Sequence, residues 1–452
     1  MGRLGAGKEW AGRQLHFVGV GGAGMSAYAR AAQALGATVS GSDRADSPFA
    51  AALAADGVLE ATIGHRAQNV PAGDRVEVVC SSAIAADNPE REAALARGLR
   101  VLTRAQLLEQ LSALRRTIAV AGAHGKTTTS AMIVSALRGG GLDPSYLIGG
   151  ILRDSGRNGE WHESEWLVVE ADESDRSMLS LHTEIAVLTN VELDHHDAYG
   201  SLHELQAAYR QFLAGAATAV IWDRPGLLAL REGPFRAYDA PAPPPGASAP
   251  RLRFDGVEVA LALPGEHNAR NAAAAMTVAA LLGVGANDAA RGLASFGGTA
   301  RRFERLGSTA GGAALYDDYA HHPTEIAATL AAARTLVPGR LIAVFQPHLY
   351  SRTRALAAQF GAALARADIV VVLDVYPARE RAEDFPGVSG LRIAEATVDA
   401  AGGRATYWLP DRERAAAIVG ALAGKDDLVV VMGAGDVDGL GRALAAAGAE
   451  HA

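Results

Sequence analysis

Short runs of β-branched and other apolar residues alternate along the chain with longer stretches rich in Ala and Leu. The runs end in Gly or polar residues, as at positions 16–20, 117–121 and 341–345. Continuous apolar runs of this length are typical of parallel strands covered by helices, and the stretches between them have the length of crossover helices. The pattern therefore predicts an α/β protein with mostly parallel sheets.

Ten segments carry the strand pattern, and they are spread over the whole sequence. They are residues 16–20, 38–40, 76–80, 117–121, 166–170, 185–189, 313–316, 341–345, 369–373 and 428–432. Two glycine-rich turns and a Gly-Gly join at 297–298 divide these strands into three groups. Since 452 residues are too many for a single core, we expect three domains, at 1–103, 104–296 and 297–452.

Composition and charge exclude several classes of protein. The net charge is −8 and no basic cluster is present, which argues against a nucleic-acid partner. No apolar stretch reaches the roughly 18–20 residues of a membrane span, and the first 14 residues contain no signal-peptide core. The single cysteine, Cys80, cannot form an internal disulfide, so we expect a cytoplasmic protein without membrane insertion.

A glycine-rich loop follows the predicted strand 117–121 and precedes a helical stretch. Backbone N–H groups of such a loop approach phosphate oxygens, and the helix N-terminus adds a partial positive charge. Lys126 would reach the β- and γ-phosphates and Thr127 would ligate Mg²⁺. The spacing G-x-x-G-K-T is shorter than the usual G-x-x-x-x-G-K-T, yet strand, loop and helix in this order disfavour a chance match. The predicted ATP-binding residues are Gly122, Ala123, His124, Gly125, Lys126, Thr127 and Thr128.

An earlier glycine turn has the spacing of a dinucleotide-binding turn. Gly19, Gly21 and Gly24 match G-x-G-x-x-G after a predicted strand, and Asp43 follows the next strand. In this Rossmann arrangement a pyrophosphate lies at the helix N-terminus and an acid contacts a ribose hydroxyl. The match alone does not distinguish NAD from another nucleoside diphosphate, such as a UDP-sugar.

Two acidic clusters end consecutive predicted strands, at 170–175 and 190–197. The carboxyl ends of parallel strands meet at one edge of a sheet, so both clusters could reach a magnesium nucleotide on the phosphate loop. Glu170 suits Mg²⁺, whereas a histidine ligand such as His195 is less usual. Solvated acidic loops compete with this interpretation, above all for Asp175 and Asp197.

Four later groups of polar residues are candidates for one further site, at 267–271, 301–304, 317–323 and 346–352. Each could be a helix cap or a surface charge on its own, but together they indicate a site assembled across a domain cleft. The pair His321-His322 could suggest zinc. Adjacent residues rarely share a metal, however, and the single cysteine is distant in sequence, so a metal hydrolase is disfavoured.

In type and order these motifs resemble those of the Mur ligase family, over nearly the whole chain. The resemblance rests on 16–26 (HFVGVGGAGMS), 40–43 (SGSD), 81–84 (SSAI), 87–89 (DNP), 122–129 (GAHGKTTT), Glu170, Asp194-His195, 267–271 (HNARN), 301–303 (RRF), 317–323 (DDYAHHP) and 345–348 (FQPH). It implies a Rossmann-like UDP-sugar domain, a P-loop ATPase-type central domain and a Rossmann-like C-terminal domain that closes over the amino acid.

The resemblance also implies an activity. The best fit is the member that joins L-alanine to UDP-N-acetylmuramate with ATP and Mg²⁺ in peptidoglycan precursor biosynthesis. ATP would phosphorylate the sugar carboxylate, and the amine of alanine would attack the resulting acyl phosphate. The alternative within the family is a recycling ligase that joins a murein tripeptide to the same sugar. The sequence does not distinguish a monomer from a homodimer.

Site roles follow from the resemblance residue by residue. The implied UDP-sugar ligands are Gly21, Gly22, Gly24, Asp43 and His65. The implied magnesium ligands are Thr127, Glu170 and His195. His267 and Asn271 would contact the adenine, and Arg302 and Asp317 the nucleotide. Alanine would be oriented by Asp318, His321 and Arg352, with Arg352 on its carboxylate. Lys126, Glu170, His195 and His321 are the expected catalytic residues, and either His321 or a carboxylate would take the amine proton.

Two other classes of function remain to be tested. A nicotinamide dehydrogenase would explain the first glycine turn but leaves the loop around Lys126 without a purpose. A regulatory protein that binds ATP and a UDP-sugar without catalysis would keep every motif. Phosphate release that depends on both substrates separates the three hypotheses.

Overall fold

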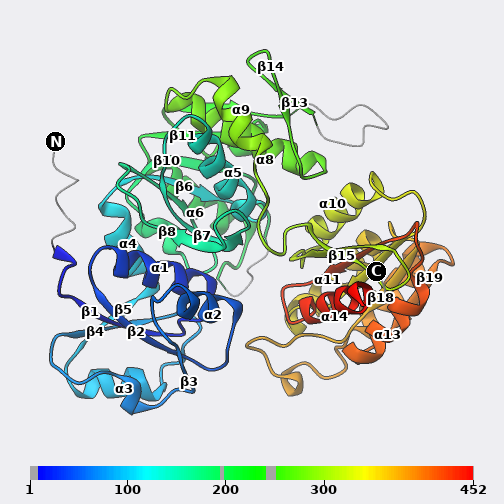
Figure 1. Cartoon of the computed structure of the whole chain (residues 1–452), viewed down its shortest axis with the longest axis horizontal. Coiled ribbons are helices and arrows are strands. Elements are labelled where there is room, and N and C mark those ends of the chain that lie inside the picture. Colours follow the sequence, from blue (N-terminus) through cyan, green and yellow to red (C-terminus); the bar gives the residue numbers. More distant parts are fainter. Residues whose placement is uncertain (1–8, 194–197, 241–250, 451–452) are drawn as a thin grey trace. The chain divides into compact units, whose positions relative to one another are not determined.

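Residues 9–193, 198–240 and 251–450 are described by the computed structural model, and they form two units. The first unit holds the described residues up to Gly297, apart from Arg251 and 261–269. The second unit holds those residues and 298–450. The first contains two large sheets and the second contains one (Figure 1).

The first sheet has five parallel strands in the order β3-β2-β1-β4-β5. The strands are β1 (Gln14–Val18), β2 (Thr38–Asp43), β3 (Thr62–Ile63), β4 (Val76–Cys80) and β5 (Arg100–Thr103). Its helices are α1 (Ala23–Ala34), α2 (Pro48–Ala55) and α3 (Pro89–Ala96), with the short 3₁₀ helix η2 (Ala67–Asn69). Because β1 lies between β2 and β4, the chain order reverses at its carboxyl end, where open parallel sheets bind ligands.

The second sheet has seven strands in the order β12-β11-β10-β6-β9-β7-β8, and only β8 is antiparallel to its neighbour. They are β6 (Arg116–Ala121), β7 (Ser145–Leu152), β8 (Arg157–Glu160), β9 (Trp166–Glu170), β10 (Thr183–Leu188), β11 (Thr218–Trp222) and β12 (Phe235–Tyr238). A separate ribbon pairs β13 (Arg251–Phe254) with β14 (Val257–Ala260). Strand β6 lies between β9 and β10, so the segments after these three strands meet at one edge.

The helices of this region are α4 (Arg104–Ala113), α5 (Lys126–Gly139), α6 (Leu202–Ala214), α7 (Pro225–Leu228), α8 (Glu266–Leu281) and α9 (Ala286–Ala294), with the 3₁₀ helix η3 (Ser177–Ser180). Helix α5 is buried along most of its length and packs against α9. That close approach requires glycine at 139 and 292, since a Cβ at either position would lie within 2.3 Å of backbone oxygen on the other helix. The tight packing therefore holds the C-terminal end of α5 against α9.

The third sheet has six strands in the order β15-β16-β20-β17-β18-β19, all parallel except β15. They are β15 (Glu304–Ser308), β16 (Ala314–Asp318), β17 (Leu341–Phe345), β18 (Ile369–Val372), β19 (Ala405–Trp408) and β20 (Leu428–Met432). The accompanying helices are α10 (Pro323–Arg334), α11 (Tyr350–Leu364), α12 (Leu391–Ala401), α13 (Arg412–Leu422) and α14 (Asp438–Ala449), with the 3₁₀ helix η4 (Ala382–Asp384). Strands β17, β18 and β20 are completely buried, as their apolar runs predict.

The mixed α/β class with mostly parallel sheets is confirmed. Four of the ten predicted strands have the predicted bounds (β4, β9, β17 and β20), and the other six overlap the observed ones. Ten other strands of the described residues were not predicted; among them, β7 is interrupted by Gly149-Gly150 and β11 follows an Ala-rich stretch. Among the helices of the described residues, none has both the length and the apolar character that a bilayer crossing demands.

Candidate active site

The phosphate loop is held rigidly between β6 and α5. Gly122 and Gly125 have φ of +135° and +81°, and a Cβ on Gly122 would lie 2.1 Å from Thr189 Oγ1. Asn190, just after β10, accepts a hydrogen bond from the N–H of His124 (2.9 Å) and donates one to its carbonyl oxygen (2.8 Å). Only glycine tolerates these positions, so the loop conformation is determined by the sequence.

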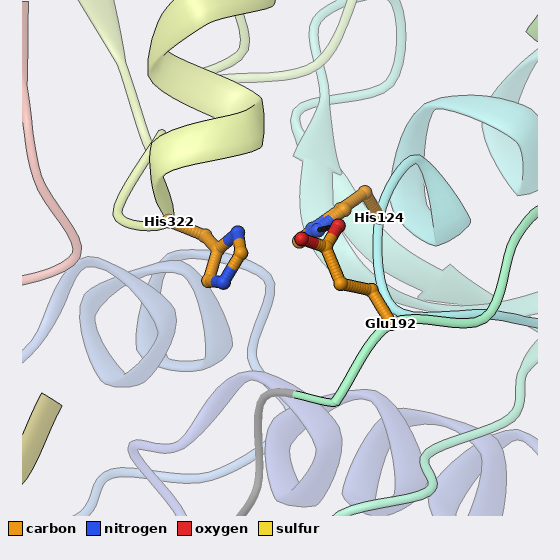
Figure 2. A group of neighbouring side chains, drawn as sticks. All are labelled: His124, Glu192 and His322. Atoms are coloured by element: carbon orange, nitrogen blue, oxygen red, sulfur yellow. Dashed lines mark hydrogen bonds and ion pairs between the residues drawn. The ribbon is translucent and has the colours of Figure 1, made fainter. Parts of the chain in front are cut away.

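His124 also contacts the second acidic cluster. Its Nε2 lies 2.9 Å from Glu192 Oε2, and Figure 2 shows the ring beside this carboxylate. The sequence predicted that the segment after β10 reaches the loop, and the structure places Asn190 and Glu192 there. His195 lies in 194–197, outside the described residues, so its role as a metal ligand stays a prediction.

The side-chain oxygens of Thr127, at the start of α5, and of Glu170, at the end of β9, lie together. The Thr127 hydroxyl donates to both carboxylate oxygens of Glu170 (3.1 and 3.0 Å), and the N–H of Gly149 donates to Oε2 (2.7 Å). A carboxylate and a hydroxyl beside a phosphate loop are the hard donors that Mg²⁺ prefers. The residues present therefore fit a magnesium ion.

Lys126 lies against Glu173, the fourth residue of the first acidic cluster. Its ammonium is 3.0 and 2.9 Å from the two carboxylate oxygens and also donates to the carbonyl oxygens of Gly122 (2.6 Å) and Ala123 (3.3 Å). Burial lowers the pKa of Lys126, but the carboxylates of Glu173, Asp172 and Glu170 outweigh it, so the pKa is raised above its usual value. The lysine is charged at neutral pH, and the sequence did not predict this partner.

Arg104 links the first acidic cluster to the first domain. It donates to Asp172 (3.2 Å) and Asp175 (2.9 Å) and lies 3.4 Å from the Tyr28 hydroxyl of α1. Burial raises the pKa of Asp172, but Arg104 and Lys126 lower it more, so it is below its ordinary value. Asp175 is therefore ion-paired. Its sequence had also been compatible with a solvated acidic loop.

A cavity of about 220 Å³ joins the first glycine turn to this carboxylate cluster. Gly22 and Gly24 line it from the first domain, and Gly149, Glu170 and Asp172 line it from the central domain. Glu170 is the residue that contacts Thr127. A ligand in this cavity would therefore extend from the first turn to the edge of the phosphate loop.

The first glycine turn is bound to Asp43. The N–H of Gly21 donates to Asp43 Oδ2 (2.8 Å), and a Cβ on Gly21 would lie 2.8 Å from Ser47 Oγ. The structure thus brings Gly21, Gly22, Gly24 and Asp43 together at the switch point of the sheet. His65 lies further back, with its Nδ1 3.2 Å from Ser42 Oγ.

Behind this turn lies a buried carboxylate that sequence reasoning missed. Glu90 is fully buried and contacts His16 Nε2 (2.9 Å), His65 Nδ1 (3.1 Å), Ser42 Oγ (2.7 Å) and Asn69 Nδ2 (2.8 Å). Burial raises the pKa of Glu90, but hydrogen bonds from these four side chains lower it to about 2. The available signal was Asn88-Pro89-Glu90, which indicates a helix start and says nothing of burial.

In the second unit Asp317 and Asp318 end β16 and are both buried. Burial raises the pKa of Asp317 to about 7, although Arg301 Nε lies 3.2 Å from its Oδ2 and lowers it. Asp318 accepts hydrogen bonds from the N–H groups of Phe303 (2.7 Å) and Ala320 (2.8 Å). Asp318 therefore holds the loop that carries His321, and its predicted contact with alanine stays a prediction.

His321, His348 and Arg352 lie together after β16 and β17. The His321 and His348 rings are 6.0 Å apart, and Arg352 Nη1 lies 3.4 Å from His348 Nδ1. His321 Nδ1 faces the Tyr319 carbonyl oxygen (3.0 Å) and the Glu325 carboxylate (3.3 Å). Two acceptors at Nδ1 favour a proton there, which leaves the lone pair of the neutral ring on Nε2.

The remaining predicted nucleotide contacts are distributed between the two units. Asn271 lies at the phosphate loop, where its Oδ1 is 2.9 Å from the position a Gly125 Cβ would occupy. His267 lies one turn earlier on α8. In the second unit the Arg302 guanidinium lies 4.9 Å from the centre of the Tyr319 ring and 4.0 Å from Glu325. His322 (labelled in Figure 2) caps α10 by accepting from the N–H of Thr324.

Comparison with known proteins identifies the family of the chain. Three domain models match in order: "Mur ligase family, catalytic domain" at 14–116, "Mur ligase middle domain" at 120–233 and "Mur ligase, glutamate ligase domain" at 301–435. The UDP-N-acetylmuramate–L-alanine ligase of Rubrobacter xylanophilus is 43% identical, over 96% of this chain and 99% of the relative. The chain belongs to the Mur ligase family.

Two solved structures of Mur ligases share the three-domain fold. The UDP-N-acetylmuramate–alanine ligase of Thermotoga maritima superposes with a TM-score of 0.80 at 26% identity, over 95% of this chain and 98% of the other. A murein peptide ligase of Psychrobacter arcticus gives 0.72 at 25% identity, over 96% and 98%. The likeness is greater to the alanine ligase than to the peptide ligase, the alternative within the family.

Proposed function

We propose that this Mur ligase joins L-alanine to the carboxylate of UDP-N-acetylmuramate through an acyl phosphate, with ATP converted to ADP and phosphate. The observation that carries the proposal is the cavity shared by Gly22 and Gly24 of the first turn and by Glu170 of the phosphate-loop edge. It allows a nucleoside-diphosphate sugar bound at the turn to present its carboxylate to a nucleotide on the loop. The relative from Rubrobacter xylanophilus is named for this reaction.

The central domain supplies the phosphoryl-transfer half of the mechanism. Loop N–H groups and the Lys126 ammonium would hold the β- and γ-phosphates of ATP and neutralise charge as the phosphoryl group moves to the sugar carboxylate. Thr127 and Glu170, with His195, would hold Mg²⁺, which supplies charge neutralisation on the phosphates when bound. Asn271 and His267 would contact the adenine, and Arg302 and Asp317 would contact the nucleotide from the C-terminal domain.

The C-terminal domain would bind alanine and prepare its amine for attack. Arg352 would bind the alanine carboxylate, and His321, on the other side of His348, would accept the amine proton at Nε2. The amine then attacks the acyl carbon and phosphate leaves. Glu325 and the Tyr319 carbonyl oxygen keep the proton of the His321 ring on Nδ1, so the lone pair of the neutral ring is on Nε2.

The same proposal places the enzyme in the cytoplasm, in peptidoglycan precursor biosynthesis, and keeps the domain boundaries at 103 and 296. UDP-sugar binding is assigned to Gly21, Gly22, Gly24, Asp43 and His65. A dehydrogenase would leave the contacts of Lys126 and Thr127 without a role. A purely regulatory protein is excluded only by turnover.

Phosphate release measured in four mixtures tests the proposal. We expect release above background only when ATP, Mg²⁺, UDP-N-acetylmuramate and L-alanine are all present, because the acyl phosphate needs the sugar and its breakdown needs the amine. The comparison mixtures contain ATP alone, ATP with the sugar, and ATP with alanine. Equal release from ATP alone would contradict a ligase, and no release from the full mixture would favour a binding protein.

A further inference from the structure

The ion pair between Lys126 and Glu173 lies beside the phosphate loop, where the phosphates of ATP are expected to bind. The ammonium contacts both carboxylate oxygens at about the same distance, 3.0 and 2.9 Å, and is 2.6 Å from the Gly122 carbonyl oxygen of the loop. The Lys126 side chain is 12% exposed and that of Glu173 is 2% exposed. The ammonium is thus largely shielded from water and is in direct contact with the carboxylate of Glu173.

The backbone of Glu173 is held in place by hydrogen bonds. Its carbonyl oxygen accepts hydrogen bonds from the Tyr199 hydroxyl (3.1 Å) and the N–H of Arg176 (3.1 Å). The neighbouring carboxylates have other cations or donors: Asp172 pairs with Arg104, and Glu170 accepts from Thr127 and Gly149. Glu173 is therefore the carboxylate in direct contact with the Lys126 ammonium.

We propose that Glu173 is a positioning residue that holds the Lys126 ammonium in the nucleotide-free enzyme and releases it to the phosphates of an arriving nucleotide. The inference deepens the proposed function, on which its role in turnover rests. Two anions would compete for one ammonium at a largely buried site, where charges interact more strongly than in water, so the carboxylate weakens nucleotide binding. Glu173 thereby sets the affinity for ATP and ADP, and the competition favours release of ADP after turnover.

The test is ADP binding to the full-length protein without sugar or alanine, measured by calorimetry for wild type and Glu173→Gln. Removing the competing charge is expected to lower the Kd for ADP about tenfold. The Kd for AMP, which lacks the β-phosphate, is expected to change less than twofold. If Glu173 had a merely structural role, its replacement would weaken the binding of ADP and AMP together. The ratio of the two Kd values therefore separates the two roles.

A matched control and a second variant complete the test. Glu184→Gln removes another carboxylate of the central sheet, which pairs with Arg116 at a partly exposed site, and is expected to leave both Kd values unchanged. Glu173→Asp keeps the charge but shortens its reach, and is expected to lower the Kd for ADP two- to threefold. If Glu173→Gln does not fold, the aspartate variant decides.

An unchanged or higher Kd for ADP in the folded glutamine variant, or in the aspartate variant where it alone folds, would overturn the inference. Such a result would leave the ligase proposal intact, because ADP binding is measured apart from catalysis. Conversely, absence of alanine-dependent phosphate release would contradict the ligase proposal and leave the nucleotide affinities to decide the role of Glu173.

Discussion

Replacing Lys126 by Met is expected to lower the rate of product formation by about a thousandfold or more. The ammonium is the one side-chain cation that contacts the loop carbonyls of Gly122 and Ala123 in the described structure, and methionine keeps its apolar stem without the charge. Preorganised positive charge at a transferring phosphoryl group commonly contributes more to catalysis than any other single interaction. Steady-state product formation by the purified variant measures the loss.

Two comparisons make this result specific. The Kd for UDP-N-acetylmuramate is expected to stay within about twofold of wild type, since the sugar is assigned to the first glycine turn. Lys425→Met changes the other lysine among the described residues, which is exposed before β20, and should keep full activity. A Lys126→Met enzyme that keeps more than a tenth of wild-type activity would contradict the assignment. So would one that no longer binds UDP-N-acetylmuramate.

Replacing Glu90 by Gln is expected to lower the free energy of unfolding by about 3 kcal/mol. The carboxylate is fully buried and accepts from His16, His65, Ser42 and Asn69. A neutral amide loses these charge-assisted contacts and introduces donors that face other donors. The lowering of the Glu90 pKa from 4.5 to about 2 corresponds to a stabilisation of the ionised folded state by a similar amount, about 3 kcal/mol.

The pH dependence of this difference has a definite sign. Because the pKa of Glu90 is depressed on folding, its contribution is fully present above pH 4.5 and is lost as the pH falls toward 2. Urea unfolding of wild type and variant should therefore show a constant gap from pH 7 to 5 that narrows below 4.5. Glu92→Gln, in the same first turn of α3 but exposed, should change stability by less than about 0.5 kcal/mol. A gap that widens on acidification would contradict this account.

Much of the fold and of the candidate site could be predicted because both depend on local patterns. Buried parallel strands are continuous apolar runs, so β9 and β17 have their predicted bounds. Gly19, Gly21, Gly122 and Gly125 are required by positive φ or close approach, and a spacing motif records such positions directly. The closeness of Glu170 to Thr127 could be predicted because Glu170 ends a strand beside the loop.

The remainder depends on side-chain partners that are distant in sequence. Lys126 is 47 residues from Glu173, and Glu90 is 74 from His16, so no local pattern pairs them. Strand β7 is apolar but contains two adjacent glycines, one of which lets the backbone approach Glu170. Such residues look unfavourable for a strand until their tertiary contact is known.

The central claim is that L-alanine itself is joined to the UDP-sugar, and product mass measures this most directly. The enzyme is incubated with ATP, Mg²⁺ and UDP-N-acetylmuramate, and with either L-alanine or the tripeptide L-Ala-γ-D-Glu-diaminopimelate. We expect a product heavier than the sugar by one alanine residue, with ADP and phosphate in equal amounts, and no tripeptide adduct. A tripeptide adduct without an alanine adduct would contradict the account.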